Sequence, residues 1–181
     1  MDEKLINKGI WVHNEAPAGD ELTVAVTGLG RSGTTMIARV LSELGVTMGH
    51  KLTPMTHEDK EFQLALKKRD TDEFSRLCRA RNDQYRIWGF KCPALRGDLS
   101  NYATLMRKPR FIIPFRDILA VSLRNNISIS ADMIDSLARS ANAYGNLVSQ
   151  ISNLRAPVLS ISYEKALQFP EETVNAVSRF C

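Results

Sequence analysis

A glycine-rich loop between two apolar segments constrains the fold of this chain more than any other feature of its sequence. Residues 22–27 (LTVAVT) form a short run rich in β-branched side chains, which favours a buried β-strand. The glycine loop follows directly, at residues 28–35 (GLGRSGTT). Apolar residues then recur at the spacing of one helix face over residues 36–44, and Gly45 is a suitable helix stop. The sequence therefore predicts a strand, a glycine loop and a helix, in that order.

Strands and helices are expected to alternate along the rest of the chain. Short apolar runs predict further strands at residues 87–91, 111–115 and 157–162. Helical periodicity appears over residues 59–81 with a break near Asp70-Thr71, again from Asp117, over residues 131–154 and from Pro170. This alternation is typical of an α/β fold, with a parallel β-sheet flanked by helices on both faces. We expect one domain over residues 1–181, with residues 1–20 as an irregular lead-in.

The longest expected helix, at residues 131–154, carries an apolar stripe. Its members recur at helical spacing and are Met133, Ile134, Leu137, Tyr144, Leu147, Val148 and Ile151. We expect this stripe to form the buried face of the helix.

The composition places the chain among ordinary globular proteins. Of its 181 residues, 44% are hydrophobic and 24% charged, which excludes disorder, collagen and coiled coil for the whole chain. A net charge of +4 is too small for the dense basic stripe of a nucleic-acid-binding protein. The three cysteines form no CxxC pair, the first residues lack an apolar signal region, and no apolar run reaches the roughly 20 residues of a membrane span. We therefore expect a cytoplasmic protein with no nucleic-acid partner and no transmembrane segment.

The glycine loop contains the residue types that bind phosphate groups. Backbone N–H groups of such a loop converge on an anion, and the dipole of the following helix favours negative charge there. The usual nucleoside-triphosphatase loop has a lysine after its last glycine, where it reaches the terminal phosphates. Here Thr34 occupies that position, and the cation is Arg31, three residues earlier. The loop therefore indicates a different phosphate ester; the simpler alternative is a tight strand-to-helix turn without a ligand.

The sequence resembles the sulfotransferases that use 3′-phosphoadenosine 5′-phosphosulfate (PAPS). Their phosphosulfate loop reads K/R-S-G-T-T, and residues 31–35 (RSGTT) match it throughout. Further segments resemble family motifs in the same order along the chain. These are residues 44–62 ("LGV.MG … ED.EF" in bacterial members), 88–93 ("WG.K.P"), 115–122 ("R-D-P … V-S") and 162–171 ("YE … P").

The resemblance implies roles for the loop residues and for a second cation. The 5′-phosphosulfate would be held by Gly30, Arg31, Ser32, Gly33, Thr34 and Thr35. Arg31 would also neutralise charge on the bridging oxygen as the sulfuryl group leaves. Lys91, at the end of its strand, is a second candidate cation, with an ordinary surface lysine as the alternative. No metal is needed for this transfer, and no His/Cys cluster has metal-ligand spacing.

The general base and the 3′-phosphate site are less well defined by the sequence. His57 or Glu58 would take the acceptor's proton, but Glu58-Asp59 is also suited to cap the next helix. In the family, the arginine and serine that bind the 3′-phosphate stand eight positions apart. Here Ser122 follows Arg116 by six positions, and position eight is Arg124. We expect Arg116 to bind the 3′-phosphate together with either Ser122 or Arg124.

The sequence thus predicts a PAPS-dependent sulfotransferase. Such an enzyme transfers a sulfuryl group to a hydroxyl or amine, here of a carbohydrate or small-molecule acceptor, and releases adenosine 3′,5′-bisphosphate. A P-loop small-molecule kinase is one alternative, but it would need a substitute for the missing loop lysine. A nucleotide-binding relative without catalytic activity is another, because the 3′-phosphate segment departs from the family pattern.

Overall fold

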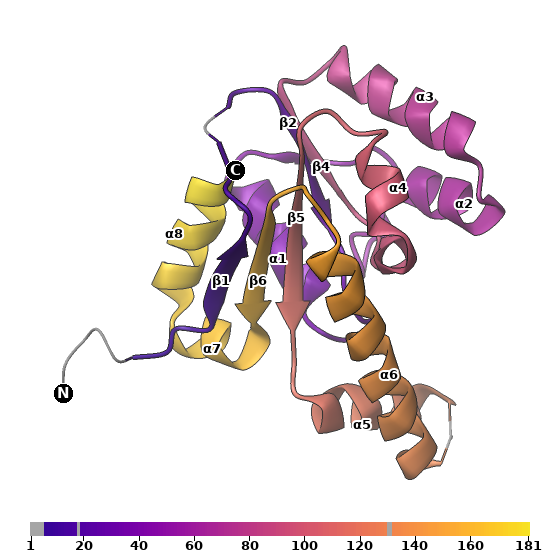
Figure 1. Cartoon of the computed structure of the whole chain (residues 1–181), viewed down its shortest axis with the longest axis vertical. Coiled ribbons are helices and arrows are strands. Elements are labelled where there is room, and N and C mark those ends of the chain that lie inside the picture. Colours follow the sequence, from indigo (N-terminus) through magenta and orange to yellow (C-terminus); the bar gives the residue numbers. More distant parts are fainter. Residues whose placement is uncertain (1–5, 18, 130–131) are drawn as a thin grey trace.

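A six-stranded β-sheet forms the centre of the computed structural model, which describes residues 6–17, 19–129 and 132–181. The strand order is β1-β6-β5-β2-β4-β3 (Figure 1). The pairings among β2 to β6 are parallel, and β1 pairs antiparallel with β6. The strands are β1 (Ile10–His13), β2 (Leu22–Val26), β3 (Thr47–Met48), β4 (Ile87–Lys91), β5 (Pro109–Phe115) and β6 (Val158–Ser162).

Helices connect these strands and cover both faces of the sheet, as the alternation of strands and helices predicts (Figure 1). The α-helices are α1 (Thr34–Glu43), α2 (Lys60–Lys68), α3 (Thr71–Asn82), α4 (Leu99–Ala103), α5 (Ile118–Ile129), α6 (Met133–Ser152), α7 (Tyr163–Gln168) and α8 (Pro170–Phe180). A 3-10 helix, η2 (Pro93–Gly97), follows β4. Within the described residues, none of these helices is long and apolar enough to cross a lipid bilayer.

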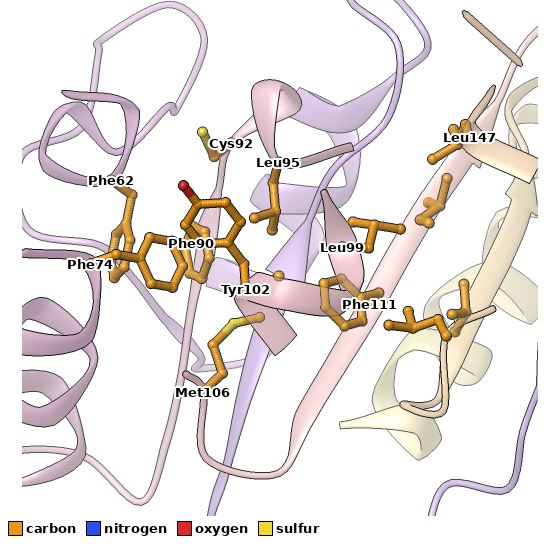
Figure 2. Close-up of a cluster of buried hydrophobic side chains, with 14 of the residues drawn as sticks. Phe62, Phe74, Phe90, Cys92, Leu95, Leu99, Tyr102, Met106, Phe111 and Leu147 are labelled. Carbon is orange, nitrogen blue, oxygen red and sulfur yellow. The ribbon is translucent and has the colours of Figure 1, made fainter. Parts of the chain in front are cut away.

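Each face of the sheet has its own hydrophobic core. On one face, Ile37 and Leu41 of α1 and Val177 of α8 pack against the strands. On the other face, helices α2, α3 and α6 contribute, and Figure 2 shows its aromatic centre. The rings of Phe62 and Phe90 stack there with centroids 4.1 Å apart. Burial of both faces explains why the inner strands read as continuous apolar runs.

Two expectations from the sequence are corrected by the structure. Residues 1–20 are not wholly irregular, because Ile10–His13 form edge strand β1. The apolar stripe expected on α6 is only partly buried: Ile134 is 72% exposed and Val148 is 53% exposed. The buried positions of α6 instead include Ser136 and Ser140, because α6 packs against α5 through small polar side chains.

The parallel strands bring distant sequence segments to one edge of the sheet. The glycine loop follows β2, Lys91 ends β4, Arg116 follows β5 and Tyr163 follows β6. In open α/β sheets, ligands bind outside the carboxyl ends of the strands. Helices α5 and α6 extend beyond this edge and form one side of it (Figure 1). The fold therefore collects the residues of the candidate site from four strand ends.

Candidate phosphate-binding site

The glycine loop adopts a tight turn that ends at the first residue of α1. Its backbone has positive φ angles at Gly28 (144°), Arg31 (68°) and Gly33 (103°). Ser32 is buried and closes the turn, because its N–H and its hydroxyl both donate to Leu29 O, at 3.2 and 2.7 Å. Gly33 is the N-cap of α1 and offers no side chain to the helix. The N–H groups of the first turn of α1 therefore lack a side-chain cap, as an anion site requires.

The ring of Tyr163 lies directly on this turn. A Cβ atom added to Gly33 would come within 2.4 Å of Tyr163 Cδ2, so this close approach requires glycine. Tyr163 also makes a cation–π contact with Arg116, whose guanidinium Cζ lies 4.6 Å from the centroid of the tyrosine ring. Tyr163 thus links the end of β6 to the glycine loop and to Arg116.

Lys91 places a buried cation beside the loop. The register of the sheet sets Lys91 opposite Val26, the last residue of β2. Its ammonium donates to Thr35 Oγ1 (3.1 Å), Thr56 O (2.6 Å) and Glu58 Oε1 (3.1 Å). Burial lowers the pKa of Lys91 from the ordinary 10.5, and the carboxylate of Glu58 acts in the opposite direction. The alternative of a surface lysine is wrong, because Lys91 is 2% exposed.

The two candidate bases point in different directions from one turn. Glu58 faces the loop through its ion pair with Lys91 and also accepts from Gln63 Nε2. His57, in a left-handed conformation, faces the outer side of α1, where its Nε2 accepts from Arg39 Nε at 3.3 Å. The structure therefore brings Glu58, and not His57, together with Lys91 and Thr35.

Asp59 has the structural role that the helix-cap alternative describes. It is the N-cap of α2, where Oδ1 accepts from the N–H of Glu61, and it is fully buried. Its other oxygen pairs with Arg81 at 3.3 Å, and Arg81 also pairs with Glu61 at 2.9 Å. These contacts hold the start of α2, and therefore the adjoining Glu58, in a fixed position.

Arg116 contacts the crest of the glycine loop, by which we mean residues 29–31. Its Nη1 donates to Arg31 O at 3.0 Å, while its buried Nε–H has no hydrogen-bond partner within the described ranges. The carboxylate of Glu164 lies 4.0 Å from Nε and accepts from the N–H of Asp117 at 3.0 Å. Tyr144 fixes the same backbone, because its hydroxyl accepts from Arg116 N and donates to Arg116 O, both at 2.9 Å.

The two partners proposed for Arg116 lie in different environments on α5. Ser122 is fully buried between α5 and α6, where its hydroxyl lies at hydrogen-bond distance from Ser140 Oγ (3.0 Å) and Ser136 O (3.3 Å). Its side chain therefore contacts α6 and not the glycine loop. Arg124 is exposed on α5.

A cavity of about 290 Å³ adjoins the crest of the glycine loop. We call it the loop-side cavity. It is lined by Leu29, Gly30, Arg96, Asn125, Asn126, Ser136, Arg139, Ser140 and Ala143, which come from the glycine loop, η2, α5 and α6. Among the residues that the structure describes, no group of three or more His, Cys, Asp or Glu side chains is arranged to hold a metal ion.

Several residues of the site were not assigned roles from the sequence. Tyr163 and Glu164 lie in a segment that resembles a family motif, so that match could have drawn attention to them. Arg96 and Arg139 lie 43 positions apart. They approach the same cavity only because η2 and α6 meet beside the loop, and no local sequence signal indicates this.

Solved structures of sulfotransferases share the fold at low sequence identity, whereas no protein-family model and no curated protein matches the sequence. The sulfotransferase STF1 from Mycobacterium tuberculosis aligns with a TM-score of 0.54 and 15% identity, over 88% of this chain and 67% of STF1. The sulfotransferase domain of the Synechococcus PCC 7002 olefin synthase aligns with a TM-score of 0.53 and 14% identity, over 93% and 76% of the two chains. An uncharacterized protein from Eubacterium ventriosum aligns with a TM-score of 0.50 and 10% identity, over 86% and 99%. The chain is therefore an α/β protein with the fold found in sulfotransferases of solved structure.

Proposed function

We propose that this chain is a PAPS-dependent sulfotransferase. The observation that carries the proposal is the position of Lys91, whose ammonium lies 3.1 Å from Thr35 Oγ1 at the start of α1. A cation from β4 therefore lies beside a glycine loop that lacks the lysine of a nucleoside triphosphatase. Arg31 on the loop crest and Arg116 beside it supply two further cations. The likeness of the fold to solved sulfotransferases supports the same assignment.

The donor's two phosphate positions fit two parts of this site. We assign the 5′-phosphosulfate to residues 30–35, where the loop and the uncapped start of α1 favour an anion. We assign the 3′-phosphate to Arg116, because its buried Nε–H lacks a hydrogen-bond partner among the described residues. Arg124 on α5 is the second residue that we assign to the 3′-phosphate. Ser122 is left out of the assignment, because its hydroxyl is bonded within the α5–α6 contact.

The charged side chains then have distinct tasks in the transfer. Bound PAPS supplies the sulfuryl group: its S–O bond to the phosphate breaks and a new bond forms to the acceptor oxygen or nitrogen. Lys91 and Arg31 stabilise the negative charge that the departing phosphate gains. Glu58, which lies 3.1 Å from the Lys91 ammonium, takes the proton that the acceptor loses.

The test is a turnover assay with PAPS carrying a radiolabelled sulfuryl group and pooled acceptors of each chemical class. We expect the label to pass to at least one pool with release of adenosine 3′,5′-bisphosphate. Lys91→Gln should lower kcat by roughly 10²–10³-fold, the usual loss when one transition-state donor is removed. Arg79→Gln on α3, an exposed arginine that contacts Ser75, is the charge-matched control and should leave kcat unchanged.

Two outcomes would contradict the proposal. Donor binding without transfer to any pool would indicate a nucleotide-binding protein that does not catalyse. Phosphate transfer from ATP-Mg²⁺ would indicate the kinase alternative.

A further inference from the structure

The loop-side cavity has room for a small molecule beside the glycine loop. Its volume of about 290 Å³ is near the lower end for small-molecule sites, which begin at about 300 Å³. Leu29 and Gly30 of the loop form one wall, so a molecule in the cavity lies next to the candidate phosphosulfate position. Helix η2, which contributes Arg96, begins two residues after Lys91 on the same chain segment.

The charges around this cavity are of one sign. Arg96 and Arg139 both line it, whereas none of the lining residues that the structure describes is an aspartate or a glutamate. Arg96 is held in place, because its Nη1 donates to Pro93 O at 3.0 Å. Its other N–H groups have no hydrogen-bond partner among the described residues and can donate to a ligand. An arginine guanidinium matches the geometry of a carboxylate. The cavity therefore favours a ligand that carries an anionic group.

The same cavity also offers neutral hydrogen-bonding groups. Asn125 and Asn126 line it from α5, and Oδ1 of Asn126 is buried with no hydrogen-bond partner in the part of the chain that the structure describes. A buried acceptor without a partner is costly unless a ligand or water satisfies it. A ligand hydroxyl would donate to this oxygen.

Hydrogen bonds between α5 and α6 hold together the wall that these two helices form. The hydroxyl of Ser122 on α5 is hydrogen-bonded to α6 at Ser136 O and Ser140 Oγ, and Ser136 Oγ donates to Ser122 O at 3.4 Å. Ser136 and Ser140 are also lining residues. Ser122 therefore positions the cavity wall, which explains its burial in a segment expected to bind phosphate.

We propose that the loop-side cavity binds the sulfuryl acceptor, and that this acceptor is an acidic hydroxyl compound such as a uronic-acid glycoside. Arg96 and Arg139 bind its carboxylate, and Asn126 accepts a hydrogen bond from one of its hydroxyl groups. This proposal rests on the proposed function, since the ligand is an acceptor only if sulfuryl transfer occurs. Binding itself can be tested separately.

The experiment uses two probes that differ only at C6, which is a carboxylate in p-nitrophenyl β-D-glucuronide and a neutral hydroxymethyl group in p-nitrophenyl β-D-glucoside. Dissociation constants are measured by ligand-observed NMR with saturating adenosine 3′,5′-bisphosphate, which keeps the carboxylate out of the glycine loop. We expect the glucuronide to bind at least tenfold more tightly than the glucoside. The double variant Arg96→Gln/Arg139→Gln should bind both probes equally, and Asn126→Ala should weaken both.

The matched control is Arg179→Gln, which removes one exposed charge from α8. It should retain the tenfold preference, and circular dichroism should show that every variant is folded. Equal binding of both probes, absence of binding, or a preference that survives in the double variant would overturn the proposal. Failure of the bisphosphate to bind would instead refute the proposed function. The dissociation constants of the two probes would then be measured without nucleotide, and the same tenfold preference would be required.

Discussion

At the scale of single residues, Lys91 shows how a sequence position acquires a function from the sheet register. The sequence marks it as a lysine at a strand end and leaves a surface role open. Pairing with β2 sets it beside the glycine loop, where burial makes its ammonium a fixed neighbour of Thr35. No local pattern could predict this, because the contact joins residues 56 positions apart.

The lowered pKa of Lys91 predicts a dependence on pH. Burial disfavours the ammonium, so Lys91 loses its proton below the ordinary lysine pKa of 10.5. Affinity for adenosine 3′,5′-bisphosphate should therefore fall as pH rises through this lowered pKa. Between the lowered pKa and 10.5, the folded chain binds fewer protons than the unfolded chain, so the cost of burying Lys91 diminishes as pH rises.

The matched variant for this dependence is Lys91→Arg, because arginine keeps its charge throughout the alkaline range. Calorimetric titrations from neutral to alkaline pH should show the loss of affinity in the natural chain and a flat profile in the variant. The same alkaline loss in both proteins would show that another group is responsible.

Gly33 illustrates a position where the conformation itself requires the residue. Its φ is +103°, and a Cβ would lie 2.4 Å from Tyr163 Cδ2. Gly33→Ala should lower the free energy of unfolding by about 1–3 kcal/mol, the range for a strained backbone residue. Gly30→Ala is the control, because no atom of the described residues, apart from its two chain neighbours, lies within 4 Å of its Cβ position. That variant should stay within about 0.5 kcal/mol of the natural chain.

Urea denaturation of the two glycine variants measures both free energies. Equal stabilities would contradict the close packing of Tyr163 on the glycine loop.

At the scale of elements, the sequence predicts those helices whose ends carry clear caps. The break expected near Asp70-Thr71 is present, and Asp59 and Asp70 are the N-caps of α2 and α3. Edge strand β1 was missed because its apolar run, residues 10–12, is only three residues long and does not alternate with polar residues. The apolar stripe on α6 was partly wrong, because periodicity alone cannot indicate that serines form its contact with α5.

The two capping aspartates predict unequal losses of stability. Asp70→Ala removes an exposed cap and should cost about 1 kcal/mol. Asp59→Ala removes a buried cap and also one of the two carboxylates that pair with the buried Arg81, so that only Glu61 remains. It should therefore lower the free energy of unfolding by about 3–5 kcal/mol. Thermal unfolding of both variants measures the difference. A loss at Asp59 no larger than that at Asp70 would show that the Asp59–Arg81 pair contributes little.

At the scale of the whole molecule, the alternation of strands and helices was sufficient to predict the α/β class, and the glycine loop was predicted at its position between strand and helix. The site could be predicted only in part. The loop residues are contiguous, so a motif identifies them. Arg116, Tyr163 and the loop-side cavity depend on strand order and helix packing, which bring together segments far apart in the sequence.

The central claim is a site for a nucleotide with a 3′-phosphate, and thermal stability with different nucleotides tests it most directly. The melting temperature is compared with adenosine 3′,5′-bisphosphate, ADP and ATP-Mg²⁺ at equal concentration, for the natural chain and for Arg116→Gln. A ligand at 100 times its Kd adds about 2.7 kcal/mol, which raises Tm by roughly 5–10 °C in a chain of this size. We predict that the bisphosphate alone gives this shift and that Arg116→Gln loses its advantage over ADP. Stabilisation by ATP-Mg²⁺ alone, or no shift with any nucleotide, would contradict the account.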